Sequence, residues 1–482
     1  MTHRALVCRF SVVAALVGAL SACAGSSGAS AIPGQAPAHR DRSGSTPITH
    51  IVLMVQENRT FNDLFATFPG AVGTTTGQEL VSGVEKPIPL TESKLEQKKN
   101  VTHLYKAFLT AYQNGAMDGF NLIKFVNGGQ YENTLPYEYV NPSQVKPYWA
   151  IADQWGLADE MFQPQGSDSF VAHQDLIRGS ACITAPSTCD TSYASSLIDS
   201  PTAPKLWGCA SDPGTKTSVI SGTLQESTNG PFPCTSDFPN YGSNGYATLR
   251  DLLDAKGVSW KYYTPQFNNK QADGLWNAFS VIAAVYGKSE WYPPSGGNGV
   301  TSPETTVLKD ISKGTLPAMS WVIPDAFNSD HPAYTKDTGP SWVATVVNAI
   351  GQSSYWKSTA VIVVWDDWGG FYDSVAPPLP RDNQGGPGFR VPMLLISPYV
   401  KVGTGSKGGY ISNTVYSFGS ILRFAEDTFN LGRLGTTDST DTSIGDMFDF
   451  AQSPRAFTKI TAPYGRSYFL HQKPSGLPVD SD

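Results

Sequence analysis

Two pairs of adjacent oxygen-bearing side chains stand far apart in the chain, each directly after an apolar run. Glu57 and Asn58 form the first pair, and Asp366 and Asp367 form the second. Carboxylate and amide oxygens are the ligands that hard divalent cations prefer. Adjacent carboxylates after a buried strand also repel each other unless a cation or a proton lies between them. The two pairs therefore predict a site for a divalent metal ion whose identity stays open.

A candidate nucleophile lies in a turn that begins with glycine, GSDSFVAHQ at residues 166–174. A serine beside a metal ion can attack an ester, because the cation favours the alkoxide, and Ser169 is the candidate. Two simpler interpretations remain open. Ser169 has the residue type of a helix cap, and Glu57 could form only a strand-end salt bridge with Arg59.

Buried strands are needed to bring these side chains together. Apolar runs rich in β-branched residues predict central strands at 48–55, 318–323, 359–365 and 391–396. Apolar residues at helical spacing predict helices at 341–350 and 417–429. Alternating strands and helices indicate an α/β fold with a parallel sheet. Ligands of such sheets bind beyond the carboxyl ends of the strands, so we expect both polar pairs to meet there.

Composition supports one large folded unit. Charged residues make up 16% of the 482 residues and aromatic residues 11%, which excludes a chain disordered throughout. The 46 glycines and 35 prolines predict long loops and argue against a helical bundle. The net charge of −7 argues against non-specific nucleic-acid binding. Because the first 46 residues are net basic, the acidity belongs to the remainder.

The N-terminus has the pattern of an export signal. Arg4 and Arg9 precede an apolar run at 10–20 that ends in LSAC, a lipobox-like sequence with Cys23 as the acceptor of lipid. We predict a lipoprotein signal peptide at 1–22, a flexible tether at 23–46 and one catalytic domain at 47–482. The protein would then be exported and membrane-anchored, in the periplasm or on the cell surface. An ordinary signal peptide, with secretion, is the alternative.

Four further cysteines fall within residues 180–245, a stretch rich in Ser, Thr, Pro and Gly. In an oxidising compartment they predict disulfides, and proximity favours Cys182 with Cys189 and Cys209 with Cys234. A zinc site would need C-x-x-C or nearby histidine spacing, which this stretch lacks. We interpret it as a disulfide-stapled insertion.

Several sequence blocks resemble the bacterial phosphoesterase family that contains non-haemolytic phospholipases C and related acid phosphatases. The similarity extends over roughly residues 47–430. The matching blocks, in order, are IVLMVQENRTF at 51–61, MDGF at 117–120, SFVAHQ at 169–174, VWDDWGGFYD at 364–373, the segment from VP at 391–392 to SPY at 397–399, and SILRF at 420–424.

The resemblance implies an alkaline-phosphatase-like fold, a parallel sheet sandwiched by helices. It implies that the two polar pairs hold the metal and that Ser169 is the nucleophile. His331 and His103 match family histidines near the phosphate, as stabilisers or proton donors. His173 is expected to orient rather than to react. The chain departs from the family pattern at Asp367, where glutamate is common, so the metal geometry or the activity could differ.

These observations predict an exported, metal-dependent phosphoesterase that hydrolyses phosphate mono- or diesters, like an acid phosphatase or a phospholipase C. Its substrates would be phosphate esters, with phospholipids among the candidates, and nucleic acid is not an expected partner. Five aromatic residues could form a choline cage or simply pack in the core; they are Trp260, Tyr262, Tyr263, Trp276 and Trp291. The alternative from another class is a non-catalytic surface lipoprotein that uses the same fold for binding. No sulfatase nucleophile segment, G-x-S-x-G motif or P-loop is present in the sequence.

Overall fold

An eight-stranded sheet forms the centre of the protein in a computed structural model. The structure describes residues 46–125, 134–184, 195–201, 206–239, 246–267, 270–271, 274–294, 296–378 and 386–477. The strand order is β13-β10-β14-β1-β15-β16-β6-β17. The strands of this sheet are β1 (His50–Gln56), β6 (Gly156–Ala158), β10 (Trp260–Tyr263), β13 (Gly299–Thr301), β14 (Met319–Val322), β15 (Thr359–Trp365), β16 (Met393–Ile396) and β17 (Tyr410–Ser412).

The predicted strands and helices are all present, and one strand runs in an unexpected direction. β1 pairs in parallel with both β14 and β15, as expected. The expectation that the strand at 391–396 also runs parallel was wrong, because β16 is antiparallel to its neighbours β15 and β6. The described parts of the connection, residues 366–378 and 386–392, contain no α-helix. A parallel return would need a long crossover, usually a helix, whereas an antiparallel return needs only a loop.

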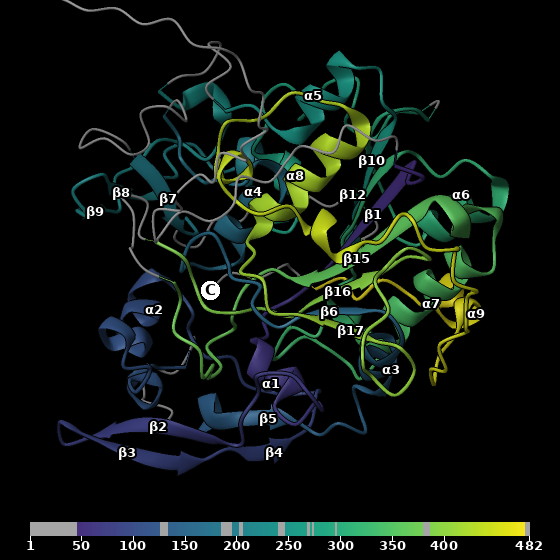
Figure 1. The fold of residues 1–482 in the computed structure, drawn as a ribbon. Helices are drawn as coiled ribbons and strands as arrows, with labels where there is room; N and C mark the ends of the chain where they lie inside the picture. The colour runs from purple at the N-terminus through teal and green to yellow at the C-terminus, as the bar shows by residue number, and fades with distance from the viewer. Residues whose placement is uncertain are drawn as a thin grey trace, which may run out of the picture. The chain divides into compact units, whose positions relative to one another are not determined.

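Helices cover both faces of the sheet (Figure 1). One group packs together as α3, α6 and α7, and another as α4, α5 and α8. The predicted helices at 341–350 and 417–429 correspond to α7 and α8. The helices are α1 (Phe61–Phe65), α2 (Tyr105–Tyr112), α3 (Lys146–Gln154), α4 (Ser169–Arg178), α5 (Leu249–Ala255), α6 (Thr306–Lys313), α7 (Gly339–Gly351), α8 (Phe418–Phe429) and α9 (Arg466–His471).

Burial on both faces explains why the central strands are continuously apolar. Every residue of β15 is buried, as are all residues of β1 after His50.

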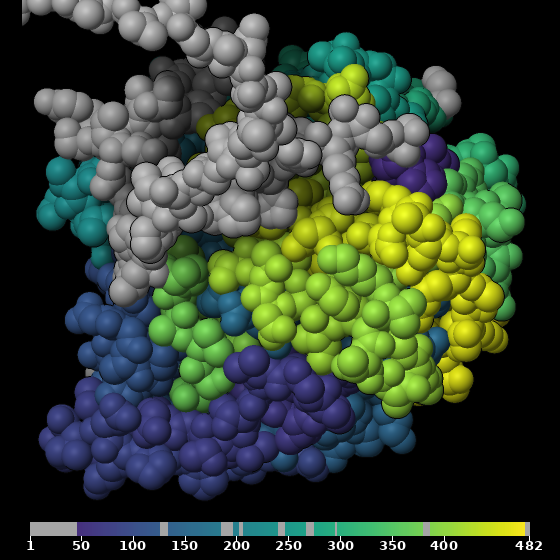
Figure 2. Space-filling model, viewed as in Figure 1, coloured from purple at the N-terminus to yellow at the C-terminus, as the bar shows by residue number. Residues whose placement is uncertain are grey.

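Two small sheets lie outside this core. One pairs β2 (Thr76–Val81) with β3 (Val84–Pro89), and the other pairs β4 (Thr91–Ser93) with β5 (Glu138–Val140). In Figure 2 the surface near the start of the described chain, in purple, meets the yellow-green surface of later segments, and Gly70 lies close to Ile411.

The cysteine-rich insertion carries its own three-stranded sheet, with β7 (Ser195–Asp199), β8 (Ser218–Ser221) and β9 (Glu226–Ser227) in antiparallel order. The predicted bridge between Cys209 and Cys234 is confirmed, with Cα atoms 4.6 Å apart. Cys182 is also disulfide-bonded. Its predicted partner Cys189 lies outside the described residues.

The predicted signal peptide, Cys23 and the tether up to residue 45 lie outside the described residues. These assignments therefore remain predictions. Within the described part of the chain, none of the helices combines the length and apolar character needed to cross a membrane.

A buried pair of carboxyl groups lies beyond β13 and β14. Glu304 and Asp325 are 6% and 4% exposed. Burial, with a further contribution from the charge of Asp325, raises the pKa of Glu304 to about 8. Glu304 therefore keeps its proton in the folded state at pH values where the unfolded chain has lost it.

This difference gives a pH dependence of stability with a defined sign. Between the ordinary glutamate pKa of 4.5 and the folded value of about 8, the folded state binds the extra proton, so stability falls as pH rises. Glutamine does not titrate, so we expect the free energy of unfolding of Glu304→Gln to fall less than that of wild type between pH 5 and pH 8. The difference between the two falls should be at least about 1.4 kcal/mol. Denaturant unfolding at both pH values measures this difference. If Glu304→Gln showed the same pH dependence of stability as wild type, Glu304 would not be the group that binds the extra proton.

Candidate active site

Strand register brings the two polar pairs together. Gln56, the last residue of β1, lies opposite Trp365, the last residue of β15. The amide N–H of Asp366 donates to the carbonyl oxygen of Gln56 at 2.9 Å. Because both strands run in the same direction and end at the same level, the residues that follow them enter the same space. The expected meeting at the carboxyl edge of the sheet is confirmed.

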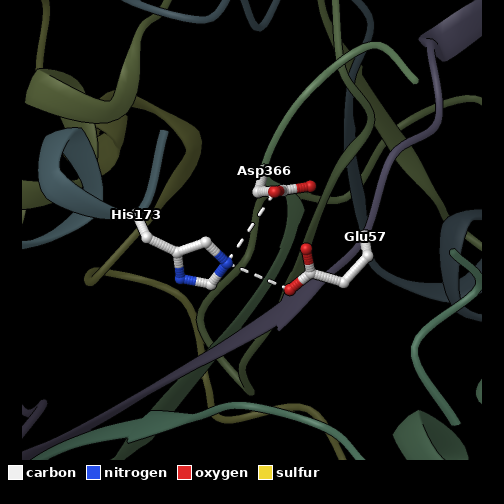
Figure 3. A group of neighbouring side chains, drawn as sticks. All are labelled: Glu57, His173 and Asp366. Atoms are coloured by element: carbon white, nitrogen blue, oxygen red, sulfur yellow. Dashed lines mark hydrogen bonds and ion pairs between the residues drawn. The ribbon is translucent and has the colours of Figure 1, made fainter. Parts of the chain in front are cut away.

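Glu57 and Asp366 meet around the imidazole of His173, which α4 supplies (Figure 3). His173 Nε2 lies 3.0 Å from Glu57 Oε1 and 3.7 Å from Asp366 Oδ2. One potential ligand atom from each residue lies within 4.8 Å of the other two, and all three side chains are buried. We call Glu57, His173 and Asp366 the acid–histidine cluster.

The acid–histidine cluster fits a divalent cation. Asp366 Oδ2 is buried and has no hydrogen-bond partner among the described residues. Burial, and next the charge of Glu57, raises the pKa of Asp366 well above its usual range. A cation would offset this repulsion. Two carboxylates with one imidazole suit transition metals such as zinc or manganese, whereas calcium and magnesium favour oxygen alone.

The other member of each polar pair surrounds Ser169. Ser169 Oγ donates to Asp367 Oδ2 at 2.8 Å. The Asn58 amide lies 3.2 Å from the same hydroxyl through Nδ2. A direct bond also joins Asn58 to the acid–histidine cluster, because the backbone N–H of Asn58 donates to Asp366 Oδ1 at 2.9 Å. The four predicted ligands thus divide into Glu57 and Asp366 at the cluster and Asn58 and Asp367 at the serine.

Ser169 is the first residue of the ten-residue helix α4, and the N-cap position belongs to Asp168. Its hydroxyl bonds to Asp367, so the cap interpretation does not describe its contacts. The helix N-terminus provides a positive potential that favours a negative charge beside Ser169. A glycine at 166 is required, because an added Cβ there would lie 2.4 Å from the ring of Phe108.

Two candidate histidines lie near one another, and one of them, His103, contacts residues that surround Ser169. The rings of His103 and His331 have centroids 6.5 Å apart. His103 Nδ1 donates to the carbonyl oxygen of Val101 at 2.9 Å, since a carbonyl only accepts. His103 Nε2 lies 2.9 Å from Asn58 Nδ2 and 3.6 Å from Asp367 Oδ2. Both histidines are fully buried, so neither is a surface residue.

Two further contacts explain residues next to the site, namely the ion pair of Arg59 and the close packing at Gly369. Arg59 pairs with Asp63 at 3.1 Å rather than with Glu57. Gly369 makes room for a chain segment, because a Cβ would lie 2.1 Å from the Asn58 carbonyl oxygen.

The candidate aromatic cage belongs mostly to the core. Trp260, Tyr262 and Tyr263 are buried residues of β10, and Trp291 is partly buried. Trp276, in contrast, lies beside a candidate histidine, with its ring centroid 5.8 Å from that of His331. Core packing therefore describes the burial of β10, while Trp276 lies beside a candidate histidine of the site.

The sequence did not reveal that the insertion supports the site. At the end of β7, Asp199 Oδ1 accepts the amide N–H of Tyr105, the first residue of α2, at 2.7 Å. The next residue, Ser200, donates its amide N–H to Asp168 Oδ2 at 2.7 Å. The insertion therefore ties the segment after His103 to the N-terminus of α4. No local motif signals these contacts, since they join residues distant in sequence.

The protein has a mixed α/β fold. The carboxyl edge of its sheet carries buried acids, histidines and a serine, which is the set of groups of a hydrolase-like site. Comparison with known families matches residues 48–432 to the Phosphoesterase family. The chain belongs to this family, which confirms the resemblance seen in the sequence.

Among curated relatives, the chain is 24% identical over 434 residues to a non-hemolytic phospholipase C of Pseudomonas aeruginosa, covering 82% of this chain and 56% of that protein. It is 26% identical over 481 residues to phospholipase C B of Mycobacterium tuberculosis, covering 90% of this chain and 83% of that protein. The chain thus spans little more than half the length of some curated relatives. A solved alkaline phosphatase superfamily structure from Vibrio parahaemolyticus covers 84% of this chain and 72% of its own, with 11% identity and a TM-score of 0.34.

The acid–histidine cluster makes a direct prediction about metal content. Replacing Asp366 by Asn removes one carboxylate charge while keeping the side-chain shape, so we expect the metal affinity to fall by at least about tenfold. Elemental analysis of purified protein, together with Mn²⁺ titration, measures this loss.

A matched control is Asp310→Asn, which removes a buried carboxylate that pairs with Lys261. This control should retain wild-type metal content. Equal metal content in Asp366→Asn and wild type would exclude the cluster as the metal site.

Proposed function

We propose that this protein hydrolyses phosphate esters with Ser169 as the nucleophile. The observation that carries the proposal is the 2.8 Å hydrogen bond from Ser169 Oγ to Asp367, beside the acid–histidine cluster. Family membership and relatives named as phospholipases C support the same class of reaction, that of a phosphoric ester hydrolase.

The residues can be given roles in two displacement steps. Asp367 accepts the Ser169 proton as Oγ attacks phosphorus, so a P–O bond to serine forms while the bond to the alcohol breaks. His331 or His103, when protonated, donates a proton to the departing oxygen. Water then attacks the phosphoserine and gives a proton to the histidine that lost one in the first step. The bond between phosphorus and Ser169 Oγ breaks, Asp367 returns its proton to Oγ, and phosphate or a phosphomonoester is released.

A divalent cation at the site would supply positive charge that stabilises the serine alkoxide and the transferring phosphoryl group. Glu57, Asp366 and His173 would hold it through the acid–histidine cluster. Asn58 and Asp367 would complete the predicted ligand set from the serine side. The N-terminus of α4 would also favour the negative charge that develops on the phosphoryl oxygens.

Export and lipid anchoring on Cys23 complete the proposal. A lipid-anchored enzyme would act on esters at or outside the membrane, and the relatives' names make phospholipid a candidate substrate. Soluble phosphomonoesters remain the other candidate, because both classes use the same groups around phosphorus. A non-catalytic binding protein is the competing function.

Replacing Ser169 by Ala tests the nucleophile. We expect hydrolysis of p-nitrophenyl phosphate and p-nitrophenyl phosphorylcholine to fall by about 10³-fold or more in kcat, because no oxygen remains to attack phosphorus. Bound metal should stay near the wild-type level. Ser167→Ala, which alters a buried serine in the same turn, should retain most activity. Surviving hydrolysis in Ser169→Ala would rule out this nucleophile.

A substrate panel separates the remaining alternatives. Phosphatidylcholine in vesicles, p-nitrophenyl phosphorylcholine and simple monoesters are compared by kcat/KM using one wild-type preparation. A preference for the choline diesters indicates a phospholipase C, and a preference for monoesters indicates a phosphatase. A metal-loaded wild-type protein that cleaves none of them would support the binding-protein alternative.

A further inference from the structure

A buried carboxylate outside the predicted ligand set lies directly before His331. Asp330 follows β14 and the short 3-10 helix Ala326–Asn328, and it is 0% exposed. Its backbone has φ 74°, in the left-handed region that residues with a Cβ adopt only at a cost. Surrounding contacts must therefore hold the chain in this conformation.

One oxygen of Asp330 collects three hydrogen bonds from three parts of the fold. Its Oδ2 accepts from the Tyr148 hydroxyl at 2.7 Å, from Trp365 Nε1 at 3.2 Å and from Gln56 Nε2 at 3.3 Å. Tyr148 comes from α3, while the other two donors end β15 and β1. All three donor side chains are fully buried.

The positions of these donors in sequence connect them to the reactive groups. Gln56 immediately precedes Glu57, and Trp365 immediately precedes Asp366. The backbone of Asp330 adds a fourth link, because its carbonyl oxygen accepts from Arg59 Nε at 2.9 Å. The segments on both sides of the acid–histidine cluster therefore converge on a single residue.

We infer that Asp330 is a positioning residue that sets the relative placement of the Glu57 segment, the Asp366 segment and His331. The inference deepens the proposed function and rests on it for the activity readouts. Asp330 touches none of the reacting atoms in this assignment, and acts through the side chains that precede the cluster residues. Its acceptor oxygen, rather than a role in proton transfer, is the feature required.

The energetic reason is that three buried donors share this acceptor. Removing it would deprive the buried Tyr148 hydroxyl and Trp365 N–H of this acceptor, which is costly, and the end of β15 would shift to find a new one. Gln56 Nε2 would keep its bond to the Asn328 carbonyl oxygen at 3.0 Å. Metal sites are sensitive to such changes, since loss of a supporting hydrogen bond typically lowers metal affinity or activity by about 10–100-fold.

A neighbouring glycine provides a way to displace Asp330 without replacing it. A Cβ added at Gly339, the first residue of α7, would lie 2.0 Å from Asp330 Oδ1 and 3.0 Å from Nε2 of its donor Gln56. Gly339 does not have a positive φ, so alanine fits the backbone there. The absence of a side chain at 339 is therefore required by the carboxylate of Asp330.

The first experiment compares Asp330→Ala with Asp330→Asn at a temperature where circular dichroism shows both to be folded. Asparagine keeps an acceptor oxygen, whereas alanine removes it. We expect Asp330→Ala to lower kcat for p-nitrophenyl phosphate by about 100-fold and to raise the Mn²⁺ dissociation constant by about tenfold. Asp330→Asn should recover at least about tenfold of the lost kcat, which general destabilisation would not predict.

The second experiment compares Gly339→Ala with Gly432→Ala. Residue 432 has open space around it, so its alanine variant tests the substitution alone. We expect Gly339→Ala to lose about tenfold or more in kcat and Gly432→Ala to remain within twofold of wild type. This pair keeps the inference testable where Asp330→Ala does not fold.

Crystal structures of Asp330→Asn and Gly339→Ala provide a readout that needs no substrate. We expect Glu57 and Asp366 to keep their places in the first and to move apart in the second. Unmoved Glu57 and Asp366 in Gly339→Ala, or a wild-type kcat in that variant, would overturn the inference. If wild type hydrolyses no ester, the proposed function fails, and these structures still decide the role of Asp330.

Discussion

The structure depends on the placement of two acidic residues side by side in a dry interior. Parallel pairing of β1 with β15, with Gln56 opposite Trp365, makes Glu57 and Asp366 neighbours. Burial, and next the charge of Glu57, raises the pKa of Asp366 well above its usual range. The surrounding groups offset this cost, with the His173 imidazole between the carboxylates and a proposed cation beside them.

Residues from distant parts of the chain hold the groups that stabilise the buried pair Glu57 and Asp366. α4 supplies His173 and Ser169 from one face, and the insertion ties the start of α4 to the segment after His103. A site with so many buried polar groups lowers stability unless each group is partnered. The continuously apolar strands β1 and β15 provide the rigid frame that holds these partners in place.

Sequence reasoning succeeded where a local pattern carries the information. Apolar runs predicted four strands of the eight-stranded central sheet, namely β1, β14, β15 and β16. Helical periodicity predicted α7 and α8, and proximity predicted the bridge between Cys209 and Cys234. It was wrong about the direction of β16, because a strand buried on both faces has the same composition in either direction. It also left His173 out of the predicted ligand set, since spacing along the chain does not show which distant side chains lie together.

The sequence by itself determined the α/β class, the family and the residues able to do chemistry, because these depend on residue type, local periodicity and ordered motifs. Only the tertiary structure decided how those residues are grouped. It placed Glu57 and Asp366 with His173, placed Asn58 and Asp367 with Ser169, and gave Asp330 its donors. The physical reason is that strand register and burial select which distant side chains meet, and neither is written in any short stretch of sequence.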